Sequence, residues 1–246
     1  TRIAKITPRS GPTSGGTKLM ISGAGFQNSE DLSCRFGSNG MFVIVPTTYF
    51  SEVSLLCSTP VGIVGPTEVA ISLDGTEFSS QNHHFVYYND ITVGGLHPYV
   101  GSERGGTVVT VLGTSFIASE ALMCKFGSNT ASKAVWLSSF AIRCISPENA
   151  PGSIVSIEVS NNGVDFSTNS ISYRYTETPR VNKITPATGP VHGGSRILIA
   201  SSNIKKSDQY FCKFSGVEGS FEASIINASL LECIAPAQDV PGHVCV

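Results

Sequence analysis

Cysteine is the residue type with the most evident chemistry in this chain of 246 residues, because thiols in an oxidising compartment join as disulfides. Six of the seven cysteines form three pairs whose members lie 20 to 23 residues apart. These candidate disulfides are Cys34 with Cys57, Cys124 with Cys144, and Cys212 with Cys233. Each would contribute about 3 kcal/mol by closing a loop. The alternative is three pairs of buried free thiols in a reducing compartment. A zinc site is not expected, because close Cys-x-x-Cys and His spacings are lacking.

The odd cysteine and one asparagine are the other candidates for covalent chemistry. Three roles are open for Cys245: a buried small hydrophobic residue, a partner of a cysteine farther along the chain, or a bridge to another chain. Asn227-Ala228-Ser229 is an N-glycosylation sequon. It falls in a polar break before the strand that ends at Cys233, so we expect Asn227 to face solvent and to carry a glycan.

The remaining polar residues predict no catalytic residue, no cofactor and no metal site. His83 and His84 are adjacent and would point to opposite faces of a strand. Neither a Gly-x-Ser-x-Gly frame nor a phosphate-binding glycine loop is present. Asp74, Glu77 and Asp165 lie near hairpins, but one or two carboxylates do not make the cage of about six to eight oxygens that calcium takes.

Two aromatic residues could form a surface on which a sugar stacks. Trp136 is the only tryptophan, and Tyr49 precedes it in the chain. Such residues more often fill the core or the rim of a β-sandwich, and no aromatic residue flanks Trp136. We therefore expect a structural role for both.

Three sequence markers recur in the same order, which indicates three copies of one unit. The first marker is a glycine pair, at Gly15-Gly16, Gly105-Gly106 and Gly193-Gly194, with a period of 88 to 90 residues. The second is Cys-Arg/Lys-Phe, beginning at Cys34, Cys124 and Cys212. The third is a cysteine followed three positions later by proline, at Cys57, Cys144 and Cys233.

The units are predicted to consist of β-strands. After each glycine pair, apolar and polar residues alternate, so the inward-facing residues are predicted to be Leu19 and Ile21, Val109 and Val111, and Ile197 and Ile199. Asp74-Gly75 and Asn162-Gly163 suit a two-residue type I′ hairpin, which needs positive φ at both central positions. Segments FVYY at Phe85 and YRY at Tyr173 are predicted to be closing strands.

In these markers the chain resembles the IPT/TIG family of immunoglobulin-like domains. The likeness covers essentially the whole chain, although Gly101-Ser102 replaces the usual Gly-Pro in the second unit. It implies an all-β fold, a rod-like array of tandem immunoglobulin-like β-sandwiches. It does not single out a function. Similar domains occur in plexin-type and growth-factor receptor ectodomains, in fibrocystin-like surface proteins, in Rel-type transcription factors and beside secreted carbohydrate enzymes.

The repeat also predicts the domain boundaries. The first IPT/TIG domain spans residues 1–89, the second 90–177 and the third 178–246. The third lacks counterparts of the hairpin and of the final strands, so we expect the natural chain to continue beyond Val246. Donation of the missing strands by another chain is the alternative.

Composition excludes several classes of function. Charged residues make up 14% of the chain and the net charge is −2, which leaves no electrostatic footprint for nucleic acid. No apolar run approaches the roughly 20 residues of a membrane helix, so no direct membrane insertion is expected within this segment.

We therefore expect no enzyme, but a non-catalytic extracellular structural or adhesive module of a longer cell-surface, matrix or filament protein. Its partners would be other protein chains, through self-assembly or as an extracellular protein partner. A ligand-binding stalk of a plexin-like receptor ectodomain is the main alternative, and it predicts an exposed apolar patch on one unit only. Accessory domains of a secreted carbohydrate-active enzyme are a further alternative, and a carbohydrate partner has the weakest support.

Overall fold

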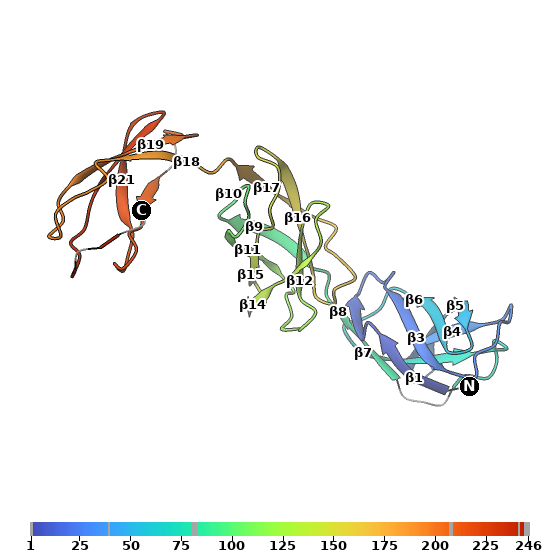
Figure 1. Cartoon of the computed structure of the whole chain (residues 1–246). Coiled ribbons are helices and arrows are strands. Elements are labelled where there is room, and N and C mark those ends of the chain that lie inside the picture. Colours follow the sequence, from blue (N-terminus) through green and yellow to red (C-terminus); the bar gives the residue numbers. More distant parts are fainter. Residues whose placement is uncertain (1, 39, 80–82, 207–208, 241, 244–246) are drawn as a thin grey trace. The chain divides into compact units, whose positions relative to one another are not determined.

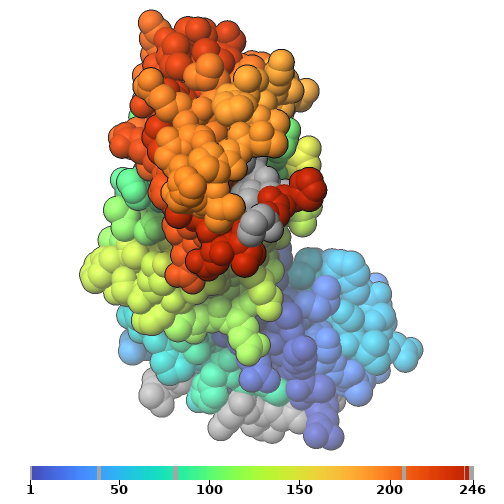
Figure 2. Space-filling model, turned by 60° about the vertical axis from the view of Figure 1, so that its left-hand side comes forward, coloured from blue at the N-terminus to red at the C-terminus, as the bar shows by residue number. Residues whose placement is uncertain are grey.

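The computed structural model describes residues 2–38, 40–79, 83–206, 209–240 and 242–243, and its regular secondary structure is entirely β. The chain forms two compact units, residues 1–175 and 176–246. The first unit contains two β-sandwiches with separate cores, and the second unit has a third core (Figure 1). The space-filling view shows the atoms of the second unit in orange to red (Figure 2).

The first sandwich consists of two layers that share one long strand. One layer contains β1, β3 and β6, and the other contains β4, β7, β8 and β2. Strand β5 joins the layers, because its first half pairs with β4 and its second half with β6. The strands are β1 (Arg2–Thr7), β2 (Ser10–Pro12), β3 (Lys18–Ala24), β4 (Ser33–Ser38), β5 (Met41–Ser51), β6 (Ser54–Ser58), β7 (Gly65–Ser72) and β8 (His83–Tyr88).

The second sandwich repeats this arrangement with separate strands in the place of β5. Its layers have the orders β14-β15-β11-β9 and β10-β17-β16-β12-β13. The strands are β9 (Thr92–His97), β10 (Val100–Ser102), β11 (Val108–Thr114), β12 (Met123–Phe126), β13 (Ser132–Lys133), β14 (Val135–Ser138), β15 (Ala141–Ile145), β16 (Ile154–Ser160) and β17 (Ile171–Thr176).

The second compact unit contains five strands in the order β18-β19-β22-β21-β20. The first residues of β21 pair with β20 and its later residues pair with β22, as the two halves of β5 do with their own neighbours. The strands are β18 (Arg180–Thr185), β19 (Arg196–Ser202), β20 (Tyr210–Cys212), β21 (Phe221–Asn227) and β22 (Leu230–Ile234).

The alternation predicted after each glycine pair is confirmed in β3, β11 and β19. Leu19, Ile21, Val109 and Val111 are fully buried, and Ile197 and Ile199 are buried in the third core. Residues of β strands alternate between faces, so every second side chain enters the core. The closing strands predicted at Phe85 and Tyr173 are confirmed as β8 and β17.

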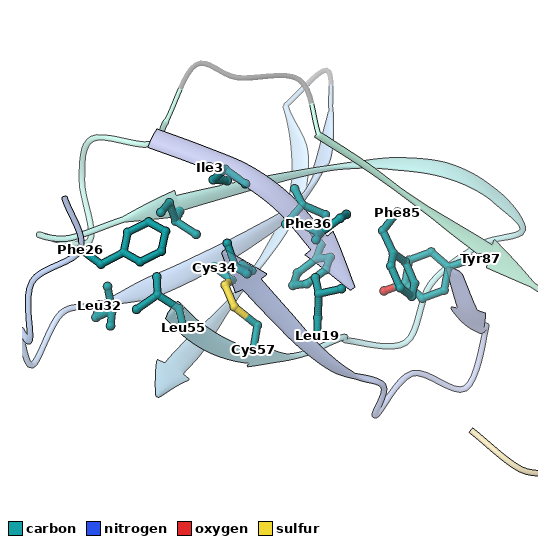
Figure 3. Close-up of a cluster of buried hydrophobic side chains, with 14 residues drawn as sticks. Ile3, Leu19, Phe26, Leu32, Cys34, Phe36, Leu55, Cys57, Phe85 and Tyr87 are labelled. Atoms are coloured by element: carbon teal, nitrogen blue, oxygen red, sulfur yellow. A yellow bond between two sulfur atoms is a disulfide. The ribbon is translucent and has the colours of Figure 1, made fainter. Parts of the chain in front are cut away.

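A disulfide joins the two layers of each sandwich. Figure 3 shows the bond between Cys34 on β4 and Cys57 on β6, surrounded by apolar side chains such as Leu19, Leu55 and Phe36. Cys124 is bonded to Cys144 in the second sandwich, and Cys212 to Cys233 in the second compact unit. All six cysteines of these disulfides are buried.

The glycine pair and the Cys-x-x-Pro segment, two markers far apart in sequence, contact each other. A β-carbon at Gly105 would lie 2.6 Å from the carbonyl carbon of Pro147, and Gly105 has a φ of +73°. The next glycine, Gly106, donates its N–H to the Ser146 carbonyl at 2.9 Å. The same contacts occur between Gly15 and Pro60 and between Gly193 and Pro236. The two markers therefore recur together because they form one contact.

The second marker also has a structural explanation. The Arg35 guanidinium lies 4.6 Å from the ring centre of Phe78, and the Lys125 ammonium lies 4.6 Å from that of Phe166. Each phenylalanine lies four residues after the first residue of the predicted hairpin dipeptide. A cation above an aromatic face is attracted by the ring, by about 0.5–1 kcal/mol at an exposed site. The basic residue of the marker thus holds the hairpin against the sheet.

The predicted type I′ hairpins are wrong. Gly75 and Gly163 have positive φ, with values of +74° and +77°, but Asp74 and Asn162 do not. The side chain of Asp74 instead accepts hydrogen bonds from the N–H groups of Thr76 and Glu77, both at 2.9 Å. Asp and Asn side chains compete in this way with the backbone bonds of a tight turn. Asn162 makes the equivalent bonds in the second sandwich.

Candidate functional site

The junction of the first two sandwiches is the candidate site, because polar groups from both meet there. The Asn162 amide donates to the Ser10 carbonyl at 2.8 Å and to Asp165 Oδ2 at 2.7 Å. The Thr17 hydroxyl donates to the same carboxylate oxygen at 2.7 Å. Ser10 and Thr17 belong to the first sandwich, whereas Asn162 and Asp165 belong to the second. Hydrogen bonds thus connect residues about 150 positions apart in sequence.

One hairpin of the second sandwich positions these groups. The Asn162 Oδ1 accepts bonds from the N–H groups of Val164 and Asp165 and from the Ser160 hydroxyl, at 2.8 to 3.0 Å. This leaves the amide nitrogen of the same side chain to bond across the junction. Asn162 is buried, so an unpaired amide there would carry the cost of losing its bonds to water.

The first sandwich supplies a turn and the end of a strand. Ser10–Pro12 of β2 pairs in parallel with Val86–Tyr88 at the end of β8. The following turn brings Ser14 to Asp90, whose Oδ1 accepts from the Ser14 hydroxyl at 3.0 Å and from its N–H at 3.2 Å. Asp90 lies in the segment between the two sandwiches, so this contact fastens the connecting chain to the first sandwich.

A hollow of about 140 Å³ lies at this junction. The carboxylates of Asp90 and Asp165 line it, together with Ser14, Tyr88, Ser167 and Thr168. Tyr88 is only 5% exposed, and in the part of the chain that the structure describes its hydroxyl has no hydrogen-bond partner. Burial raises the pKa of Tyr88 well above its ordinary value, and the negative charges of Asp165 and Asp90 raise it further. The hydroxyl therefore remains protonated beside two anions.

The predicted covalent sites lie elsewhere. The disulfides are buried in the cores, away from solvent. Asn227 ends β21 and is exposed, and its Oδ1 accepts from the N–H and the hydroxyl of Ser229 at 2.9 and 3.1 Å. Cys245 lies outside the described residues. The sequence therefore pointed to single residues and not to the junction, whose parts are distant along the chain.

The candidate aromatic surface is divided between two sandwiches. Tyr49 lies on β5 and packs against the first core. Trp136 occupies the equivalent position on β14, is 42% exposed, and donates its indole N–H to the Phe116 carbonyl at 3.2 Å. Each thus has a structural role at the rim of its own sandwich.

An exposed apolar side chain recurs at one position of every unit. Phe50, Leu137 and Ile226 each lie seven residues before the second cysteine of their unit, and they are 59%, 42% and 49% exposed. In the first sandwich, β5 adds four consecutive exposed apolar residues, Met41–Ile44. Exposed apolar surface of this kind is repeated along the chain and is not confined to one unit.

The described residues contain neither a cluster of three metal-binding side chains nor a membrane-spanning helix. No group of three or more His, Cys, Asp or Glu side chains is arranged there to hold a metal ion. No helix long and apolar enough to cross a bilayer occurs among them.

Successive immunoglobulin-like sandwiches, each with one disulfide between its layers, define a class of modular β-protein. The chain belongs to the IPT/TIG domain family, and matches to the IPT/TIG domain cover residues 2–87, 92–175 and 179–246.

Plexins are among the relatives. Plexin-A3 of Rattus norvegicus is 26% identical over 255 residues, and Plexin-A2 of Mus musculus is 27% identical over 247 residues. Both alignments cover 96% of this chain but 13% of the relative, so the chain spans a small part of these proteins. Human Fibrocystin-L is 25% identical over 206 residues, which cover 82% of this chain and 5% of that protein.

A solved structure of the full extracellular region of Plexin A4 matches with a TM-score of 0.49 and 23% identity, over 97% of this chain and 21% of that one. The plexin relatives and the disulfides assign the chain to the extracellular space or the cell surface.

Proposed function

We propose that the chain is a non-catalytic, semi-rigid spacer in the extracellular part of a plexin-like cell-surface protein. The observation that supports this proposal best is the bonded junction of the first two sandwiches. Asn162 and Asp165 bond to Ser10 and Thr17, and Ser14 holds the connecting residue Asp90. Such bonds oppose rotation of one sandwich against the other, whereas neighbouring domains without them move independently.

The chemistry of the side chains agrees with a role without catalysis. Hydrogen bonds of the junction are made by amide, hydroxyl and carboxylate groups within the protein. The tyrosine hydroxyl beside them is held protonated and is therefore a poor base. A spacer acts by holding neighbouring parts of a larger protein at a set separation, which needs only stable domains and stiff connections.

The test compares two alanine variants of equivalent hairpin residues. Asn162→Ala removes the bond to Ser10, while Asp74→Ala removes the same kind of hairpin cap in the first sandwich. Residual dipolar couplings report the orientation of each sandwich. We expect the first two sandwiches to align as one body in the wild type and in Asp74→Ala, and to align independently in Asn162→Ala. Independent alignment in the wild type would refute the spacer role.

Self-assembly is a second candidate function, and the repeated exposed apolar residue favours it. Phe50, Leu137 and Ile226 lie on strands whose nearby backbone pairs on one side with β6, β15 and β22. An apolar strand with an open edge is a template for another chain. Sedimentation of the wild type, Phe50→Lys and Thr48→Lys measures their association. Thr48→Lys is the control, because Thr48 is an exposed, polar residue of the same strand. Association that Phe50→Lys weakens and Thr48→Lys leaves unchanged is expected, and a wild type that stays monomeric at every concentration contradicts it.

A further inference from the structure

Two carboxylates at the junction keep free oxygens. Asp90 uses Oδ1 for Ser14, and Asp165 uses Oδ2 for Thr17 and Asn162. Their other oxygens, Asp90 Oδ2 and Asp165 Oδ1, accept no hydrogen bond from the described residues. Both side chains line the same hollow, and the described residues around that hollow include no lysine, arginine or histidine. Two negative charges therefore face one space without a cation of the protein between them.

The basic residue that contacts Phe166 of the hollow already has partners. Lys125 forms an ion pair with Glu158 at 2.6 Å and lies over the ring of Phe166, which lines the hollow. Its ammonium is thus held on the sheet. No lysine, arginine or histidine lines the hollow among the described residues, so a cation placed between Asp90 and Asp165 would come from solvent.

A buried tyrosine provides an independent indication of a ligand. Tyr88 lines the same hollow, is 95% buried, and has a hydroxyl with no hydrogen-bond partner among the described residues. Leaving a buried hydroxyl unpaired costs about 1–3 kcal/mol, so native proteins pair such groups or place water or an ion against them. Its position in the same hollow as two carboxylates favours a cation with bound water over an anion.

We propose that this hollow binds one divalent cation of the calcium class, with Asp90 and Asp165 as the charged ligands, and with water and neighbouring hydroxyls completing the oxygen cage that the two carboxylates alone do not make. Calcium takes oxygen ligands from carboxylates, hydroxyls, carbonyls and water. Ser14, Ser167 and Thr168 line the same space, and the Tyr88 hydroxyl can donate to a water on the ion. Two carboxylates make a site of low charge, so the dissociation constant is on the order of 10⁻⁴–10⁻³ M, the range of extracellular modules.

The consequence of binding would be a third link across the junction. Asp90 belongs to the connecting segment and Asp165 to the second sandwich. An ion bound to both would link them to each other and, through water, to Tyr88 at the end of β8. This inference does not rest on the spacer role. An ion can bind whether or not the junction sets the separation of distant parts.

Calorimetric titration of the full chain with CaCl₂ tests the site. Asp90→Asn and Asp165→Asn keep the size of each side chain and remove its charge. Glu77→Gln is the matched control, because Glu77 follows Asp74 as Asp165 follows Asn162 but lies outside the lining of the hollow. We expect one bound calcium in the wild type and in Glu77→Gln, and an affinity lower by about tenfold or more in either Asp→Asn variant.

Terbium luminescence locates the ion with a second readout. Tb³⁺ occupies calcium sites and emits when a nearby tyrosine absorbs light, so Tyr88→Phe should remove most of the calcium-displaceable emission. The variant should fold normally, because the lost hydroxyl has no partner. The proposal is overturned by a lack of calcium binding in the millimolar range, by binding that survives both Asp→Asn changes, or by emission that Tyr88→Phe leaves intact. Residual dipolar couplings without calcium still test the spacer role in each case.

Discussion

The two glycines of a pair differ in how much space surrounds them. Both Gly105 and Gly106 have positive φ, a conformation that costs other L-residues about 1–2 kcal/mol. Only Gly105 also lies so close to Pro147 that a β-carbon would overlap the backbone, while a β-carbon at Gly106 meets open space. The same side chain should therefore have different effects at two adjacent positions.

Alanine substitution measures this difference. We expect Gly106→Ala to lower the free energy of unfolding of the second sandwich by about 1 kcal/mol, and Gly105→Ala to lower it by clearly more, because the backbone around Pro147 must move. Urea denaturation of both variants is the measurement. Equal losses would mean that strain in φ, and not contact with Pro147, explains the first glycine.

Asp74 gives the first sandwich a pH-dependent contribution to stability. Hydrogen bonds from the N–H groups of Glu77 and Thr76, and from the Ser72 hydroxyl, lower the pKa of Asp74 below its ordinary 3.8. A carboxyl with a lowered folded pKa stabilises the fold above its unfolded pKa, and this stabilisation is lost as the pH falls through the folded pKa.

Asp74→Asn separates this effect from that of the other carboxyl groups. Asparagine makes the same turn at position 162, so the variant should fold. We expect the stability of the wild type to fall more steeply than that of Asp74→Asn as the pH is lowered below about 4. Thermal melts over a pH series are the measurement, and parallel curves would show that the turn does not depend on ionised Asp74.

Disulfides act at the scale of the element, because each connects strands of opposite layers. Cys124 on β12 is bonded to Cys144 on β15 in the second sandwich. Removing both in Cys124→Ala/Cys144→Ala frees a loop of 20 residues in the unfolded chain, so we expect a loss of about 3 kcal/mol. Denaturation with and without reductant checks this. A wild type that loses no stability on reduction would show that the disulfide between the layers does not stabilise the sandwich.

The end of β21 is the predicted site of a glycan. Asn227 is exposed where its strand turns toward β22, and neighbouring Ile226 is half exposed. We expect chain secreted from animal cells to carry an N-glycan that Ser229→Ala abolishes, as mass spectrometry of the peptide would report. A fully unmodified Asn227 in secreted wild type would rule the site out. A glycan there would cover the open strand edge beside Ile226, so the proposed association between chains would then rest on Phe50 and Leu137.

Local patterns predicted the strands and the cysteine pairs. Alternation identified Leu19 and Ile21 as core residues, because one face of a half-buried strand must be apolar. The turn at Asp74 was predicted wrongly, because a side-chain oxygen replaced the backbone geometry that the Asp-Gly dipeptide usually adopts.

The junction could not be predicted in the same way. Thr17 and Asp165 are 148 positions apart, and no periodicity relates a residue to the surface of another domain. Only the placement of the second sandwich against the first brings Asp90, Tyr88 and Asp165 to one hollow.

At the scale of the whole molecule, the chain is a series of similar domains. The hairpin residues at the junction are among those that differ from one domain to the next. The cores repeat the same positions, and each has its own disulfide. Asp165, by contrast, has Glu77 as its counterpart in the first sandwich, and Asn162 has Asp74. Two of the residues that bond across the junction thus differ from their counterparts, whereas Thr17, which also bonds across it, has a threonine, Thr107, as its counterpart.

The contact between a glycine pair and its Cys-x-x-Pro segment has a consequence for anyone who recombines these domains. Gly105 and Pro147 are separated by 42 residues, and the other two repeats have the same two residue types in the same contact, as Gly15 with Pro60 and Gly193 with Pro236. A chimera cut between the two markers would therefore keep this contact, because every repeat supplies the same glycine or the same proline to it. Recombination among these repeats preserves the glycine–proline contact, whichever domain supplies each half.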